Sequence, residues 1–122
     1  EEALLPRDLQ ELLILRVAQV NDSAYEQSVH RPIAIKCGVA PAKIEALPSW
    51  RDSAVFEPKE RAALAYVDAI IAGPHVPDDV FNAVRKHYDE REVVELTVLA
   101  GTYIMHNRVF TALRVDVEPA KG

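Results

Sequence analysis

Glu26 and His30 form a pair of residues whose types and spacing could support acid–base chemistry. They lie four positions apart in a segment with helical periodicity, so their side chains are expected to be neighbours on one helix face. A half-buried carboxylate beside an imidazole brings proton affinities towards neutral pH, which suits a general acid or base. The alternative is an exposed helix pair in which Glu26 serves only as a cap, because structural ion pairs produce the same spacing.

Glu11 is the second candidate, because it interrupts an otherwise apolar stretch. If its helix and the helix of His30 form an antiparallel hairpin with a turn at Asn21, the two side chains lie at the same height. Glu11 is ten residues before that turn and His30 is nine after it, at about 1.5 Å per residue. A surface ion pair of Glu11 with Arg7 or Arg16 is the alternative, and periodicity does not separate the two.

Three polar residues share one face of the last expected helix. Tyr103, His106 and Asn107 are spaced by three and four positions and could line a pocket or a contact between subunits. The alternative for Tyr103 is a core aromatic residue with a satisfied hydroxyl. The single cysteine, Cys37, has apolar neighbours in the sequence, and we expect it to be a small buried side chain without thiol chemistry.

The sequence contains no motif for a metal or a cofactor, and we expect neither. It lacks His-Glu-x-x-His, a cysteine pair, an Asp-rich calcium loop, a glycine-rich phosphate loop and Gly-x-Ser-x-Gly. A net charge of −5 without a Lys/Arg cluster argues against nucleic-acid or membrane partners. The single cysteine and the lack of a visible signal peptide favour the cytoplasm. Because the sequence opens at Glu1 rather than Met, we expect a segment ahead of it.

Helical periodicity dominates the chain, and glycine is scarce, so the fold class expected is all-α with about six helices in a single domain, 1–122. Asp22 and Ser23 are both suitable N-cap residues for the second helix, Glu26 lies at the capping-box distance from Ser23, and Gly38 is expected to end the helix. Pro32 should kink this helix or loosen one of its hydrogen bonds, and the tail after Val117 should fray. The expected helices span 7–20, 23–37, 41–47, 58–71, 77–88 and 90–113, with a loop at 48–53.

An ordered set of segments carries a resemblance to a known family. It comprises residues 11–21, 23–30, Gly38-Val39, 43–47, 62–68, 94–96, Gly101-x-Tyr103 and 112–115. Together they resemble the carboxymuconolactone decarboxylase and alkylhydroperoxidase D-like (AhpD-like) superfamily over nearly the whole chain. The resemblance implies an AhpD-like helical domain that assembles as a homotrimer or hexamer, and several helices with more than one apolar side are compatible with self-association.

The peroxidase branch of that superfamily has a glutamate ahead of a C-x-x-C pair and a histidine four residues after the second cysteine. The glutamate and the histidine match Glu11 and His30, whereas the cysteine positions are Ser23 and Glu26. Neither residue can form a sulfenic acid or a disulfide. Alkylhydroperoxidase activity of the peroxiredoxin type is therefore a disfavoured alternative.

The decarboxylase branch resembles this sequence in carrying Glu-x-x-x-His ahead of a Gly-Val turn, as in Glu26 to Gly38-Val39. It implies acid–base catalysis on a small anionic lactone with loss of carbon dioxide. Such an anion needs a cationic anchor, for which the sequence offers Arg16, Arg31 or Arg108.

The function expected from these residues is acid–base chemistry, a decarboxylation or a related lyase or hydrolase reaction, on a small carbonyl or lactone substrate. A non-catalytic oligomeric binding protein is the remaining alternative. The expected catalytic residues are Glu11, Glu26 and His30, and the expected substrate-binding residues are Tyr25, Tyr103 and His106.

Overall fold

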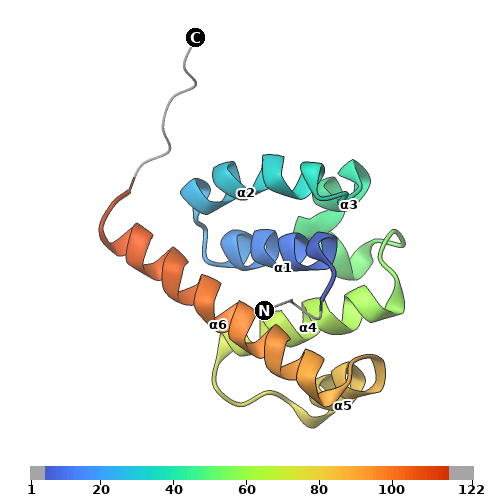
Figure 1. Ribbon diagram of the computed structural model, residues 1–122. Coiled ribbons are helices and arrows are strands. Elements are labelled where there is room, and N and C mark those ends of the chain that lie inside the picture. The colour runs from blue at the N-terminus through green and yellow to red at the C-terminus, as the bar shows by residue number, and fades with distance from the viewer. Residues whose placement is uncertain (1–4, 116–122) are drawn as a thin grey trace.

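The computed structural model describes residues 5–115, and within them the chain is helical without strands (Figure 1). The all-α fold expected from the sequence is confirmed, and the expected fraying after Val117 lies outside the described residues. The helices are α1 (Arg7–Val20), α2 (Ala24–Lys36), α3 (Pro41–Ala46), the 3-10 helix η1 (Leu47–Asp52), α4 (Pro58–Ala72), α5 (Asp78–His87) and α6 (Glu90–Ala112). None of the helices in this part of the chain has the length and apolarity of a membrane span.

One local expectation was wrong. Residues 48–53 were expected to form a loop, but most of them belong to η1, because the Arg61 guanidinium binds three backbone carbonyls there, those of Trp50, Arg51 and Ser53. Pro32, which was expected to kink its helix or loosen one hydrogen bond, lies inside α2. Helix α2 continues through this residue to Lys36, and Pro32 lies on its exposed side, away from the packed interface.

Helix α1 lies at the centre of the fold. It packs against α2 on one side and against α4 and α6 on the other (Figure 1). Its apolar side chains are buried around most of its circumference, which is the pattern of a core helix rather than of a surface helix. The fully buried ones include Leu12, Leu13, Val17 and Ala18.

The turn between α1 and α2 fixes how these two helices face each other. Asp22 adopts a left-handed backbone with φ of 54°, and Ser23 N donates to Ala18 O at 2.8 Å. Ser23 Oγ then accepts from the backbone N–H of Glu26 and caps α2. These bonds reverse the chain within three residues, so α2 runs back along α1 as an antiparallel partner (Figure 1).

Asp68 on α4 holds η1 and α1 in place. Its carboxylate accepts from Arg16 Nε at 2.8 Å and Nη2 at 3.0 Å, and from Trp50 Nε1 at 3.1 Å. The Arg16 and Asp68 side chains are mostly buried, so this two-pronged ion pair is shielded from water. One carboxylate therefore joins three elements of the fold.

Asp68→Ala is expected to lower the free energy of unfolding by about 2–3 kcal/mol, because it leaves the Arg16 guanidinium and the Trp50 indole without their shared acceptor. Urea denaturation measures the change. The matched control is Glu45→Ala, which removes an exposed ion pair with Arg31 and should cost less than about 0.5 kcal/mol. Equal losses in the two variants would contradict this role of Asp68.

Candidate active site

Glu11 and His30 meet across the α1–α2 hairpin. His30 Nδ1 lies 2.9 Å from Glu11 Oε1, and the two side chains are only 12% and 5% exposed. The register expected from the hairpin is therefore correct. Glu11 also contacts a nearby arginine, since Arg7 Nη2 lies 3.4 Å from Glu11 Oε2. The other arginine considered, Arg16, pairs with Asp68 instead.

Glu26 is buried next to this pair, at the start of α2. Its backbone N–H is capped by Ser23 Oγ at 3.3 Å, but its carboxylate does not return the bond, so the expected capping box is only half present. Instead the side chain turns inwards, and Glu26 Oε2 has no hydrogen-bond partner among residues 5–115. A buried oxygen without a partner is costly, so such an atom is a candidate contact for a ligand or a water molecule.

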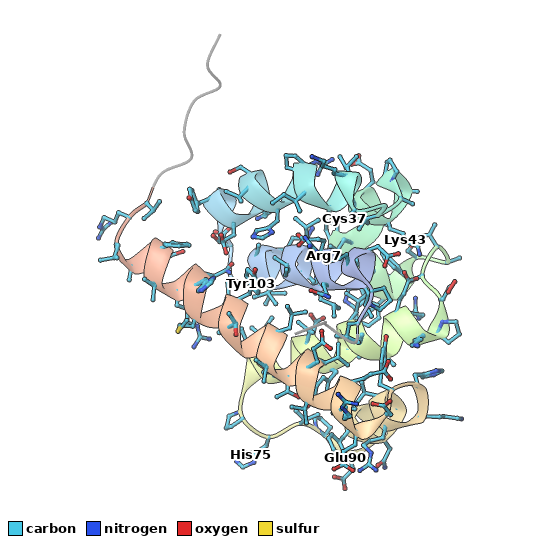
Figure 2. All side chains as sticks on the ribbon, in the orientation of Figure 1. Arg7, Cys37, Lys43, His75, Glu90 and Tyr103 are labelled. Atoms are coloured by element: carbon cyan, nitrogen blue, oxygen red, sulfur yellow. The ribbon has the colours of Figure 1, made fainter. Side chains whose placement is uncertain are left out.

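Tyr103 on α6 closes the other side of the same site. Its ring packs edge-on against the His30 imidazole, with 5.4 Å between the ring centroids, and it lies between α6 and α1 (Figure 2). Burial raises the pKa of the Tyr103 phenol above its ordinary value of 10.0, and the charges of Glu11 and Glu26 raise it further, whereas Arg7 lowers it. The phenol is therefore held neutral as a hydrogen-bond donor.

A row of rings continues along α6 away from the carboxylates. His106 packs edge-on against Tyr103 with 5.2 Å between centroids, Phe110 follows at 6.0 Å from His106, and Tyr25 of α2 packs edge-on against Phe110 at 5.3 Å. All three residues expected to bind substrate belong to this row. The structure thus brings them into one continuous surface with His30, although their binding roles remain predictions.

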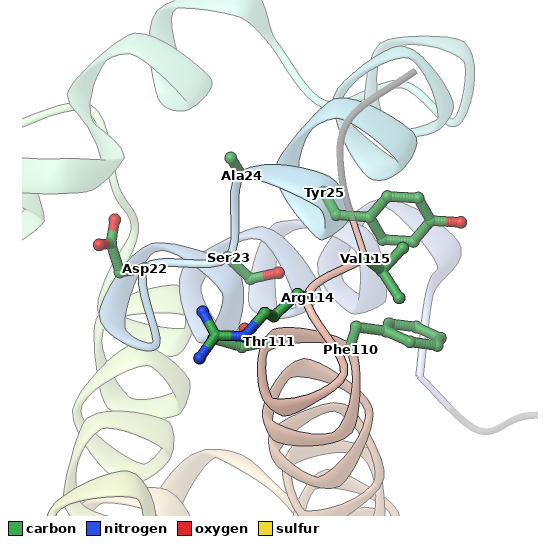
Figure 3. Close-up of a pocket in the computed structure, with 8 residues that line it drawn as sticks. All are labelled: Asp22, Ser23, Ala24, Tyr25, Phe110, Thr111, Arg114 and Val115. Carbon is green, nitrogen blue, oxygen red and sulfur yellow. The ribbon is translucent and has the colours of Figure 1, made fainter.

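The row ends at a cavity of about 270 Å³ between the α1–α2 turn and the C-terminal end of α6 (Figure 3). Its lining residues come from these two regions only: Asp22, Ser23, Ala24, Tyr25, Phe110, Thr111, Arg114 and Val115. Tyr25 is the one expected site residue in the lining. The Glu11, Glu26 and His30 side chains do not line the cavity, and Ser23, which lines it, caps the backbone N–H of Glu26.

Cys37 lies apart from this site. It was expected to be buried but is only half-buried, at the C-terminal end of α2 near α3 and away from Tyr103 (Figure 2). Residues 5–115 also contain no group of three or more His, Cys, Asp or Glu side chains placed to hold a metal ion.

The sequence model of the carboxymuconolactone decarboxylase family matches residues 2–69. The chain belongs to this family. Its relatives include the uncharacterized protein YdfG of Bacillus subtilis, which is 31% identical over 115 residues, covering 93% of this chain and 78% of YdfG. The uncharacterized protein YnjA of Escherichia coli is 33% identical over 81 residues, covering 66% of this chain and 43% of YnjA.

Solved structures show the same AhpD-like fold. ATU0492 of Agrobacterium tumefaciens, a protein of unknown function with a suggested AhpD-type role in antioxidant defence, superposes with a TM-score of 0.89 at 31% identity, over 97% of this chain and 82% of its own. A variant of the debrominase Bmp8 in complex with 2,3,4-tribromopyrrole has a TM-score of 0.83 at 22% identity, over 93% of this chain and 62% of its own, a likeness of fold alone. The carboxymuconolactone decarboxylase family match includes Glu11, Glu26 and His30 but ends before Tyr103.

Sequence reasoning missed the part of the site formed by the end of α6. Arg114 and Thr111 line the cavity, and only the chain path that returns α6 to the α1–α2 turn brings them there. Asn107 shares a face with Tyr103 as expected. Its complete burial was not expected, and neither was an Asn107 Oδ1 atom without a partner in the described part of the chain. The helical spacing predicts the side of α6 on which Asn107 lies, but it does not predict how deeply Asn107 is buried.

Glu11→Gln is expected to bring the pKa of Tyr103 closer to 10.0, because the substitution removes a negative charge that disfavours the phenolate. Arg7→Gln should move this pKa the opposite way. The difference in phenolate absorbance between each protein and its Tyr103→Phe version isolates this tyrosine. Because the pKa is raised in the folded state, the stabilising effect of the neutral phenol holds below about pH 10 and is lost as pH rises through the folded-state pKa. An unchanged titration in both variants would refute the electrostatic link.

Proposed function

We propose that this protein is an acid–base enzyme that acts on a small carbonyl or lactone substrate, with decarboxylation or a related lyase or hydrolase step as the reaction. The observation that carries the proposal is the 2.9 Å contact between His30 Nδ1 and Glu11 Oε1 in a place largely closed to water. A histidine oriented by a carboxylate is a recurrent arrangement for proton transfer.

Glu11 sets the proton position on His30. When His30 Nδ1 carries its proton and donates it to the Glu11 carboxylate, His30 Nε2 is left as the free acceptor. In this tautomer the imidazole takes a proton from the substrate and returns it later, and the nearby carboxylate stabilises the imidazolium formed in between. Arg7 holds the second Glu11 oxygen, so the carboxylate is fixed from both sides.

Glu26 and Tyr103 supply the polar contacts around the reacting group. Glu26 Oε2 accepts a hydrogen bond from a substrate hydroxyl, since no protein group within the described residues uses it. The neutral Tyr103 phenol donates to a developing oxyanion, because its raised pKa keeps the proton in place. The rings of His106 and Tyr25 form the wall along which the substrate lies.

Peroxide reduction of the AhpD type is the second candidate for this family member, suggested by the antioxidant role named for ATU0492. Ser23 and Glu26 occupy the positions that resemble the cysteine pair of the peroxidase branch, and Cys37 is at the far end of α2. Thiol chemistry with a resolving partner therefore has no pair of residues to use here. This supports the acid–base reaction over the peroxidase one.

His30→Ala is expected to lower kcat by at least about 100-fold on any substrate that the wild-type protein converts, because proton transfer loses its carrier. A panel of small carboxylated lactones with detection of released carbon dioxide provides the assay. The matched control is His75→Ala, since His75 is exposed between α4 and α5, far from α2 (Figure 2). Unchanged turnover in His30→Ala would favour the non-catalytic binding protein.

We also propose that the protein self-associates through the outer face of α6. Val94, Val98, Met105 and Val109 form an exposed stripe at helical spacing, opposite the face that packs on the core. Each is about half exposed or more, so burying them against a second copy removes a continuous apolar surface from water. This stripe supports the homo-oligomer that the family resemblance implies.

Val98→Asp is expected to reduce the oligomeric mass, because the subunit contact would have to bury a charge at the centre of the stripe. Sedimentation velocity at matched concentration measures this. Val55→Asp is the control, since Val55 is an exposed valine between η1 and α4 and lies outside the stripe. A wild-type protein that sediments as a monomer would contradict the proposed assembly.

A further inference from the structure

We propose that the cavity between the α1–α2 turn and the end of α6 binds a small organic carboxylate, with the anion held by Arg114 and the body of the molecule packed on Tyr25 and Phe110. The inference deepens the proposed function, because it places the anionic part of a substrate. Because binding can be measured without turnover, the carboxylate site and the acid–base function can be tested independently.

The cavity has one polar and one apolar side. Ser23, Thr111 and the Arg114 guanidinium lie together, whereas the Tyr25 and Phe110 rings lie side by side across from them with Val115 (Figure 3). Asp22 also borders the cavity, and its carboxylate points away from the Arg114 guanidinium (Figure 3). A molecule with a flat apolar body and one anionic end matches both sides.

The size of the cavity restricts the ligand further. A volume of about 270 Å³ is slightly below the range of about 300–1,000 Å³ that is usual for drug-sized ligands. A single ring with one carboxylate is therefore a better match than a nucleotide or a coenzyme. The net charge of −5 repels anions in general, so anion binding requires a local cation such as Arg114.

Arg114 is free for this role, whereas two of the arginines expected as anchors are not. Arg16 is committed to the buried carboxylate of Asp68, and Arg31 pairs with Glu45 at the surface. Arg114 has no ion-pair or hydrogen-bond partner for its side chain among residues 5–115. A guanidinium offers two parallel N–H donors to a carboxylate, which makes it a good terminal anchor.

The backbone of Arg114 adopts the left-handed conformation, which costs free energy in a residue other than glycine. Helices α1, α2 and α6 all end in the same hydrogen-bonded motif, in which a residue with positive φ follows the helix. At the end of α2 that residue is Gly38, the type that adopts this conformation without strain. At the other two ends it is Asp22, with φ of 54°, and Arg114, with φ of 59°, and both border the cavity.

The start of α2 also borders the cavity. Ala24 and Tyr25 occupy the first turn of this 13-residue helix and line the cavity, and backbone N–H groups at such a position have no acceptor within the helix. They complement the guanidinium in binding an anion. The ring row of Phe110, His106 and Tyr103 leads from the cavity to His30 over centroid steps of 6.0, 5.2 and 5.4 Å, so a carboxylate held here reaches the proposed acid–base group only in a molecule longer than one ring.

The experiment is a titration of the full chain with benzoate. Binding is measured by calorimetry and by the shifts of the amide NMR signals of Ala24 and Tyr25. Wild-type protein should bind benzoate at low ionic strength, and Arg114→Gln should weaken binding by about tenfold or more, the effect of losing one charged hydrogen-bonded partner. Neutral benzamide should bind more weakly than benzoate to wild type and should not distinguish it from Arg114→Gln.

Arg108→Gln is the matched control for charge, since Arg108 is an exposed arginine on α6 that does not line the cavity. It should leave benzoate affinity within about twofold of wild type. An equal loss in both variants would show a general effect of charge and would overturn the site, as would an absence of benzoate binding by wild type.

A second pair of variants keeps the test independent of folding defects. Asp22→Gly and Arg114→Gly both relieve a left-handed residue, so both should raise Tm by a few degrees. Only Arg114→Gly should lose benzoate binding. If Arg114→Gly binds benzoate as wild type does, the anchor is wrong. If benzoate binds through Arg114 but His30→Ala keeps full turnover, the carboxylate site stands and the acid–base role of His30 falls.

Discussion

The antiparallel register of α1 and α2 is the constraint on which the rest of the site depends. The turn at Asp22 places Glu11 directly opposite His30, and the resulting 2.9 Å contact is largely closed to water. Because helical side chains repeat with fixed spacing, a shift of one residue in either helix would turn one of the two groups away from the other. The geometry of the proposed acid–base pair is thus set by a turn that contains neither Glu11 nor His30.

The same hairpin explains why polar groups are tolerated so close to the core. Glu11 is balanced by His30 on one oxygen and by Arg7 on the other, so its burial is compensated. The Glu26 carboxylate lacks this compensation, because Ser23 binds only the backbone N–H and the Oε2 atom has no partner in the described residues. A fold that needed only stability would replace such a carboxylate with an apolar side chain of similar size.

Most of the fold could be predicted from the sequence because its signals are local. Proline and capping residues mark the starts of helices, as at Pro58 and Asp89, and apolar spacing marks their faces. The contact of Glu11 with His30 could also be predicted, because a short turn and helix geometry determine it. The η1 helix could not be, since it depends on Arg61 reaching distant carbonyls. Nor could the place of Arg114, which depends on where α6 crosses α1.

The two positions that resemble the peroxidase cysteines carry residues with definite tasks in this chain. Ser23 accepts the Glu26 N–H and so begins α2, a role in which an oxygen serves better than a sulfur atom. Glu26 contributes a buried carboxylate that also affects the Tyr103 phenol. If a cysteine pair had only been lost, an apolar side chain at position 26 would be expected, because its burial costs less free energy than the burial of a carboxylate. Both positions therefore carry oxygen-containing side chains with contacts of their own, which supports the proposed acid–base reaction over a thiol reaction.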